Sequence, residues 1–288
     1  MRLLFSIPSP SQNTISLGPL TVHMYGLMLL AGIIACVWLT GRRWARTGGD
    51  WDLVLRCAVW GVGFGVVGAR LYHVVTSWSE VPDPKWKGVF EVWEGGLGIW
   101  GGILFGVIAG CVIVYRDGKP VRLMMDAVAP GLLLAQAIGR IGNWWNQELF
   151  GKPTDLPWAL QIDPAHNLGY PVGTTFHPTF LYELVWDLLG VLVLLWIDRR
   201  FRIRRPGIFA LYVSWYCAFR CYEEVLRIDP GSHHYLGMRL NFWVSLGVFL
   251  VSTAFFLWWQ FARGRRGEEP AARGPRMALP KGRVRHGR

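Results

Sequence analysis

The chain has 288 residues, of which 52% are hydrophobic, and it contains 17 tryptophans. That is more apolar and more aromatic than a soluble domain of this length usually is, which points to a membrane protein. The net charge of +11 comes from short basic clusters between apolar runs and from the C-terminal end, without the continuous basic face of a nucleic-acid-binding protein, so we expect no nucleic-acid partner.

A helix needs about 20 largely apolar residues to cross the hydrocarbon core of a bilayer. Seven segments come near this length, at about residues 23–41, 53–75, 95–115, 123–139, 179–197, 207–226 and 241–261. We therefore predict an all-α polytopic fold with seven transmembrane helices, in one domain over residues 1–262. The basic segment 263–288 is predicted to be a disordered cytoplasmic tail.

Basic residues predict how the chain is oriented in the membrane. Arginines and lysines gather after the first, third and fifth spans, at residues 42–46, 116–122 and 199–205. By the positive-inside rule, these links face the cytoplasm. The N-terminus is then predicted to lie outside the membrane, and the C-terminus in the cytoplasm.

Glycines recur inside two of the predicted spans. The second span contains Gly61, Gly63, Gly65 and Gly68, and the third contains Gly102, Gly106 and Gly110. The first set matches G-x-G-x-x-G, but no strand precedes it, so close helix packing explains it better than a dinucleotide site. The five cysteines lie in apolar segments without the spacing of metal ligands, so we expect no metal site.

Polar side chains inside spans are costly and therefore mark candidate sites. With the orientation above, polar residues of five spans fall in the outer half of the membrane. They are Tyr25, Arg70, Arg140, Glu183, Arg220 and Glu224. We predict a polar chamber in the outer leaflet half, and its arginines would suit a phosphate, such as a phospholipid head group, because guanidinium offers forked donors and stays charged.

The alternative is that these arginines only pair with Glu183, Glu223 or Glu224 and brace the helices. The spacing of Arg220, Glu224 and Arg227 places them on one helix face, which fits either role. For Arg140 a ligand is favoured, because Gly139, Gly142 and Asn143 are expected to leave the nearby backbone open.

The segment 139–151 reads G-R-I-G-N-W-W-N-Q-E-L-F-G and closely resembles the signature of prolipoprotein diacylglyceryl transferases, G-R-x-G-N-(F/W)-x-N-x-E-x-x-G. Other segments resemble motifs of that family and follow in its order. They are H-M-Y-G at 23–26, G-A-R-L at 68–71, G-G-L at 95–97, H-P-T-F-L-Y-E at 177–183 and R-x-x-x-E-x-x-R at 220–227. The resemblance covers about residues 20–260.

The resemblance implies a transferase that moves the diacylglyceryl unit of phosphatidylglycerol to the lipobox cysteine thiol of a prolipoprotein. A thioether would form, glycerol 1-phosphate would leave, and neither a metal nor an organic cofactor would be needed. Residues 1–262 would then be the catalytic domain. A competing class is a membrane transporter for a lipid or another phosphate ligand, although we find no internal repeat of the kind that transporters often carry.

Motif position also implies roles for single residues. The implied catalytic residues are Arg140, Arg220, Glu148 and Tyr25. The implied substrate-binding residues are Arg140, Asn143, Arg70, Glu224, Arg227 and Gly151. Arg140 and Arg220 would clamp the phosphoglycerol head and stabilise the charge of the leaving phosphate. Glu148 would orient the signature loop, while Glu224 and Arg227 would support Arg220.

One departure from the family concerns the general base. Many members carry a histidine, often treated as catalytic, at the position of Trp100 in the third span. An indole has only a donor N–H, so Trp100 cannot accept the thiol proton. His23 and His177 are the candidate replacements, with a structural role as the alternative for each.

Overall fold

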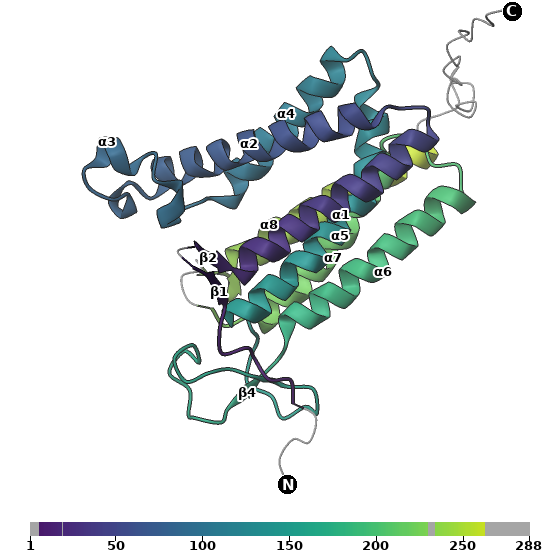
Figure 1. Ribbon diagram of the computed structural model, residues 1–288. Helices are drawn as coiled ribbons and strands as arrows, with labels where there is room; N and C mark the ends of the chain where they lie inside the picture. The colour runs from purple at the N-terminus through teal and green to yellow at the C-terminus, as the bar shows by residue number, and fades with distance from the viewer. Residues whose placement is uncertain (1–5, 19, 230–233, 263–288) are drawn as a thin grey trace, which may run out of the picture. The chain divides into compact units, whose positions relative to one another are not determined.

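The computed structural model describes residues 6–18, 20–229 and 234–262 (Figure 1). The predicted tail, residues 263–288, lies outside the described residues. The chain divides into two compact units. The first unit contains the described parts of residues 1–40 and 125–264, and the second contains residues 41–124.

Long helices make up most of both units. The first unit holds most of α1 (Met24–Arg46) and of α5 (Val121–Asn146). It also holds α6 (Thr179–Arg200), α7 (Gly207–Leu226) and α8 (Leu240–Leu257), which continues as the π-helical turn η3 (Trp258–Ala262). The second unit has α2 (Trp51–Thr76) and α4 (Ile99–Arg116). Short turns join them: η1 (Trp78–Glu80), α3 (Lys85–Gly88) and η2 (Val92–Glu94). Every predicted span therefore coincides with a helix.

Six of the helices are long and apolar enough to cross a membrane, and α7 is not among them. The prediction of seven spans is thus confirmed for six. The reason is the charge that α7 carries near its end, where Arg220, Glu223 and Glu224 interrupt the apolar run.

Three short antiparallel hairpins lie between the helices. Strand β1 (Thr14–Leu17) pairs with β2 (Leu20–His23) and leads into α1. Strand β3 (Leu160–Gln161) pairs with β4 (Thr175–Phe176) in the long link between α5 and α6, and β5 (His234–Tyr235) pairs with β6 (Met238–Arg239) immediately before α8. All three lie in segments predicted to face outward.

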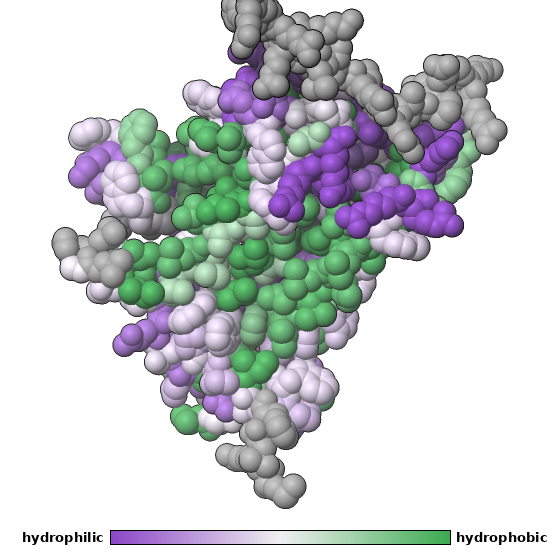
Figure 2. Space-filling view, turned by 45° about the vertical axis from the view of Figure 1, so that its right-hand side comes forward, coloured by the Kyte–Doolittle hydropathy of each residue, from purple (hydrophilic) through white to green (hydrophobic). Residues whose placement is uncertain are grey.

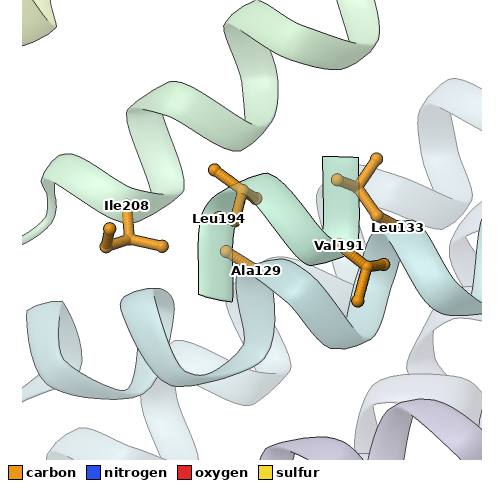
Figure 3. Close-up of a cluster of buried hydrophobic side chains, with 5 residues drawn as sticks. All are labelled: Ala129, Leu133, Val191, Leu194 and Ile208. Atoms are coloured by element: carbon orange, nitrogen blue, oxygen red, sulfur yellow. The ribbon is translucent and has the colours of Figure 1, made fainter. Parts of the chain in front are cut away.

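The core of the first unit forms where α5, α6 and α7 meet (Figure 3). Ala129 and Leu133 of α5 are fully buried against Val191 and Leu194 of α6 and Ile208 of α7. Side chains three or four residues apart share one face of a helix. The buried face of α5 therefore continues from Leu133 to residue 140, and that of α6 continues back from Val191 to residues 187 and 183.

Hydrogen bonds also join the helices of this unit. Trp186 of α6 and Trp215 of α7 stack, and each indole Nε1 donates to the other's backbone carbonyl at 3.0 Å. Ser214 of α7 lies 2.9 Å from the hydroxyl of Ser252 of α8. Such contacts hold helices together where lipid removes any hydrophobic drive for association.

The outer surface of the helices is largely apolar, as Figure 2 shows for one face. Ile99, Leu192 and Val251 are 69%, 65% and 71% exposed, respectively. Soluble monomers rarely expose contiguous apolar surface of this extent. The surface matches helices that contact lipid.

Glycines bring α2 and α4 of the second unit together. A Cβ atom added to Gly68 would lie 2.5 Å from the Gly101 carbonyl oxygen, and one on Gly101 would lie 2.1 Å from that of Gly68. A Cβ atom added to Gly65 would lie 3.4 Å from the Gly102 carbonyl oxygen. The predicted packing role is thus confirmed for most of the stripe, but it is wrong for Gly63 and Gly110, which have open space beside them.

Candidate active site

A strained turn follows α5 and carries the later part of the signature segment. Gln147 and Leu149 have φ angles of 52° and 59°, in the left-handed region that residues other than glycine rarely adopt. Hydrogen bonds hold Gln147 in place, because its Nε2 donates to Asp163 Oδ2 at 2.6 Å and to the Pro10 carbonyl at 2.9 Å. The Asp163 amide donates in return to Gln147 Oε1 at 2.7 Å. The turn is therefore fixed by two distant segments.

This turn directs Glu148 back toward the end of α5. Asn143 Nδ2 donates to Glu148 Oε1 at 2.8 Å, and Asn146 Nδ2 donates to the same oxygen at 3.3 Å. Arg140 Nη1 in turn donates to Asn143 Oδ1 at 3.3 Å. The structure therefore brings Arg140, Asn143 and Glu148 into one hydrogen-bonded chain.

A single carboxylate lies between the guanidinium groups of Arg140 and Arg220. Arg140 Nη2 donates to Glu183 Oε1 at 2.6 Å, and Arg220 Nη1 lies 4.0 Å from Glu183 Oε2. The Glu183 side chain is 1% exposed, whereas those of Arg140 and Arg220 are 16% and 14% exposed. Both arginine side chains are thus partly exposed, and Glu183 brings their guanidinium groups to the same carboxylate.

Charged residues continue beyond Arg220 as a closed ring. Glu224, which Arg220 contacts through Nη2, lies 3.8 Å from Arg227 Nη1 and 3.1 Å from Arg239 Nε. Asp229 closes the ring, because Arg227 Nε and Arg239 Nη2 each lie 2.7 Å from its carboxylate. Partial burial disfavours the charged form of Asp229, but the hydrogen bonds from Arg239 and Arg227 outweigh it and lower its pKa to about 2. Asp229 is therefore ionised at neutral pH and keeps its ion pairs with Arg227 and Arg239.

Arg239 and Asp229 were not among the candidate residues predicted from the sequence. Arg239 could have been found, because it is an arginine directly before the last span, in a link predicted to face outward, where the positive-inside rule disfavours it. In the complete cluster, ion pairs join four arginines and four carboxylates. They are Arg140, Arg220, Arg227 and Arg239, and Glu183, Glu223, Glu224 and Asp229. The pairs that the bracing alternative expected are therefore present for Arg140 and Arg220, whose side chains remain partly exposed. Among the described residues, such a pair is absent for Arg70, which donates to backbone carbonyls instead.

Tyr25 lies at the start of α1 and packs against α5, the helix that carries the first part of the signature segment. A Cβ atom on Gly142 would lie 2.7 Å from Tyr25 Cδ2, whereas Gly139 has open space beside it. The expectation that Gly142 leaves the backbone open is therefore wrong. The missing side chain makes room for the ring of Tyr25.

Gly151 lies between the residues just before α6 and the end of α7. Its amide donates to the His177 carbonyl at 3.0 Å, and it forms an isolated antiparallel bridge with Arg227. An added Cβ would lie 2.8 Å from His177 Cβ and 3.3 Å from the Leu226 carbonyl oxygen. Only a glycine fits this passage without a shift, which fixes the signature segment beside the end of α7.

The two candidate histidines have different surroundings. His177 Nδ1 lies 3.1 Å from the Tyr182 hydroxyl, beside Gly151. Partial burial, and then the positive charge of Lys152, lower the pKa of His177 below its ordinary value, which favours the neutral ring. His23 is exposed and pairs with Thr14 in the first hairpin.

Two candidate residues belong to the second unit. The Arg70 guanidinium donates to backbone carbonyls within residues 88–96, at 3.1 Å to Val89, 2.7 Å to Gly95 and 3.0 Å to Gly96, and also to Gly88. Arg70 therefore organises the segment ahead of α4, and its predicted contact with substrate stays a prediction. Trp100, the second residue of α4, is 49% exposed. Within the described parts of both units, no group of three histidines, cysteines or acidic residues is placed to hold a metal ion.

Comparison with known proteins agrees with the signature segment. The sequence profile of the family described as prolipoprotein diacylglyceryl transferase matches residues 12–258. The phosphatidylglycerol–prolipoprotein diacylglyceryl transferase of Streptomyces griseus is 45% identical over 284 residues, covering 97% of this chain and 85% of that protein. A protein of the same name from Cutibacterium acnes is 46% identical over 266 residues, covering 91% and 90%. Transferase 1 of Streptomyces coelicolor is 47% identical over 273 residues, covering 93% and 77%.

Proposed function

The chain belongs to the prolipoprotein diacylglyceryl transferase family, and from this membership we propose how its arginine cluster acts. It is a membrane enzyme that transfers the diacylglyceryl group of phosphatidylglycerol to a prolipoprotein. We place the acceptor at the thiol of the lipobox cysteine, with a thioether and glycerol 1-phosphate as products. The observation that carries the proposal is the pair Arg140 and Arg220 on either side of Glu183.

The proposed step is a substitution at carbon. The cysteine thiolate attacks the glyceryl carbon that bears the phosphate, so a carbon–sulfur bond forms while the carbon–oxygen bond breaks. The electron pair of the broken bond stays on the phosphate oxygen, and glycerol 1-phosphate leaves with one more negative charge. Arg140 and Arg220 would stabilise that charge, and their partly exposed side chains, which meet at Glu183, support this role.

Product analysis tests the proposal. Purified protein in detergent is mixed with phosphatidylglycerol and a synthetic lipobox peptide, and the peptide is examined by mass spectrometry. We expect the peptide to gain the mass of one diacylglyceryl group and an equal amount of glycerol phosphate to appear. A peptide with serine in place of the cysteine should stay unmodified. No modified peptide at all would contradict the proposal and would favour the transporter alternative.

We also propose that α7 is a seventh span and that the arginine cluster lies in a chamber open to the outer side. The charges near the end of α7 make this helix more polar than the other six, but Glu223 and Glu224 are both in contact with Arg220. Pairing lowers the cost of carrying such groups in a membrane. The N-terminus then lies outside the bacterial inner membrane, the C-terminus lies in the cytoplasm, and residues 1–262 form the catalytic domain.

This orientation predicts which links an impermeant thiol reagent can reach. In a cysteine-free background, single cysteines at Lys85 and Asp155 should react in intact cells, because both replace residues of outward links. A cysteine at Arg202 should react only after the cells are opened, because that link is rich in arginine. Labelling in intact cells at position 202 alone would show that the protein has the opposite orientation.

The pH dependence of transfer predicts whether a histidine acts as the base. Nearby arginines should lower the pKa of the bound substrate thiol from about 8.5, so its thiolate is the reactive form. Activity should then rise with pH along one limb that belongs to the thiol. Trp100→Phe, His23→Gln and His177→Gln should each keep this limb and most of the activity.

A histidine base would give a different profile. Since the pKa of His177 is lowered, its limb would lie below about pH 6.5, the ordinary value for histidine. Measured with one peptide, a loss of about a hundredfold together with the disappearance of the limb in either variant would identify that histidine as the base.

A further inference from the structure

A hollow of about 450 Å³ lies beside the signature turn. Its walls are residues 146–150, Ala165, His166, Leu168, Gly169 and Asp229. We propose that this hollow binds the acceptor polypeptide, at the residues that follow its cysteine. The proposal rests on the transferase function above and adds a binding site for the second substrate.

The lining favours a peptide over a lipid head group. Leu149, Phe150 and Leu168 supply apolar surface, while Glu148 and Asp229 supply carboxylates. No arginine or lysine is among the described residues that line the hollow. The described lining therefore offers an anionic head group no cationic side chain of Arg or Lys, whereas a peptide brings backbone N–H donors and small side chains that suit both kinds of wall.

The two carboxylates connect the hollow to both arginines of the site. Glu148 accepts from Asn143, whose own oxygen accepts from Arg140. Asp229 holds Arg227 and Arg239, and both lie against Glu224, the partner of Arg220. A chain bound in the hollow would therefore lie next to the groups that position Arg140 and Arg220.

Backbone strain gathers at the same place. Four described residues other than glycine have positive φ angles, and three of them, Gln147, Leu149 and Leu168, line the hollow. Such strain persists only where the surrounding structure fixes it, and it clusters at sites that bind ligands. Hydrogen bonds from Gln147 to Asp163 and Pro10 fix one wall before any ligand arrives.

The choice between the two sides of the cysteine follows from the chemistry of the acceptor. The residues before the cysteine belong to the apolar part of a secretory signal, which a membrane accommodates. The residues after it belong to the secreted part. The hollow is formed by the links after α5 and α7, which are predicted to face outward, so it suits the residues after the cysteine.

Filling the hollow tests the proposal. Ala165 is exposed and lines the hollow, so Ala165→Trp should block it without disturbing a packed core. We expect the KM for a lipobox peptide to rise about tenfold or more while the KM for phosphatidylglycerol changes less than about twofold. The matched control is Val172→Trp, in the same link but outside the hollow, where the side chain is 81% exposed. An unchanged peptide KM, or an equal rise in both KM values, would overturn the proposal.

Cross-linking gives a second readout that does not depend on turnover. A lipobox peptide with a photoreactive phenylalanine two residues after the cysteine should attach within residues 146–150 or 165–169 of the wild-type protein. Leu168→Asn, which keeps the left-handed backbone but removes the apolar side chain, should weaken the attachment. Attachment elsewhere would refute the hollow as the peptide site even if transfer is normal. Correct attachment without any transfer would instead refute the proposed function.

Discussion

Arg140→Lys is expected to lower the rate of diacylglyceryl transfer by about a hundredfold or more, and Arg140→Ala to abolish it. Lysine keeps the positive charge beside Glu183, so the buried carboxylate retains a cationic partner. An ammonium is a point charge, however, and cannot reproduce the forked contacts of guanidinium with a phosphate. The loss in Arg140→Lys therefore reports on the ligand more than on the fold. Turnover with saturating peptide and phosphatidylglycerol measures it.

Arg56→Gln is the matched control for removing an arginine. Arg56 pairs with Asp52 and Asp117 at 2.7 and 2.8 Å, but its side chain is 44% exposed and it belongs to the second unit. Exposed pairs contribute little, so this variant should keep its activity. Near-normal turnover by Arg140→Lys would leave Arg140 with the bracing role only.

Gly151→Val is expected to reduce turnover by about a hundredfold, because small displacements of a catalytic group carry penalties of that order. The φ angle at Gly151 is not positive, so its backbone suits other residues and crowding alone is at issue. The valine would press on His177 Cβ and the Leu226 carbonyl, the contacts that place the signature segment beside the end of α7. Overpacking of this kind costs about 1–3 kcal/mol, which most folds survive.

Gly247→Ala controls for the loss of a glycine. This residue lies in α8, and an added Cβ would have nothing within 4 Å. It should keep wild-type activity and thermal stability. Full turnover by Gly151→Val, with unfolding unchanged, would show that the passage at Gly151 adapts and does not position the site.

Hydropathy predicted the positions of the helices well but not their ends. The fourth span was expected at residues 123–139, whereas α5 runs to Asn146. An apolar window ends at the first polar residues, but the backbone hydrogen bonds of a helix do not depend on whether its side chains are apolar. The polar end of α5, with Arg140 and Asn143, is therefore helical, and this places both side chains toward Glu183 and Glu148.

The contacts of the site depended on tertiary structure that a single sequence does not contain. Helical spacing correctly paired Arg220 with Glu224 on one face of α7. It placed Arg227 on the same face, which is wrong, because α7 ends at Leu226 and Arg227 is extended, although it still lies 3.8 Å from Glu224. Arg239 and Asp229 join them only through the turn between α7 and α8, at separations that no helical period describes. The filling of the space beside Gly142 by Tyr25 likewise required the packing of α1 on α5.

Lipid binding by the purified protein tests most directly whether the arginine cluster recognises the phosphate of phosphatidylglycerol. Thermal unfolding in detergent is measured with phosphatidylglycerol and with diacylglycerol, which has the same acyl chains but no phosphate. Phosphatidylglycerol should raise the Tm of the wild-type protein and diacylglycerol should not, since a ligand stabilises the folded state that binds it. Arg140→Ala should lose this rise, and Arg56→Gln should keep it. An equal rise in Arg140→Ala, or an equal rise with both lipids, would contradict the account.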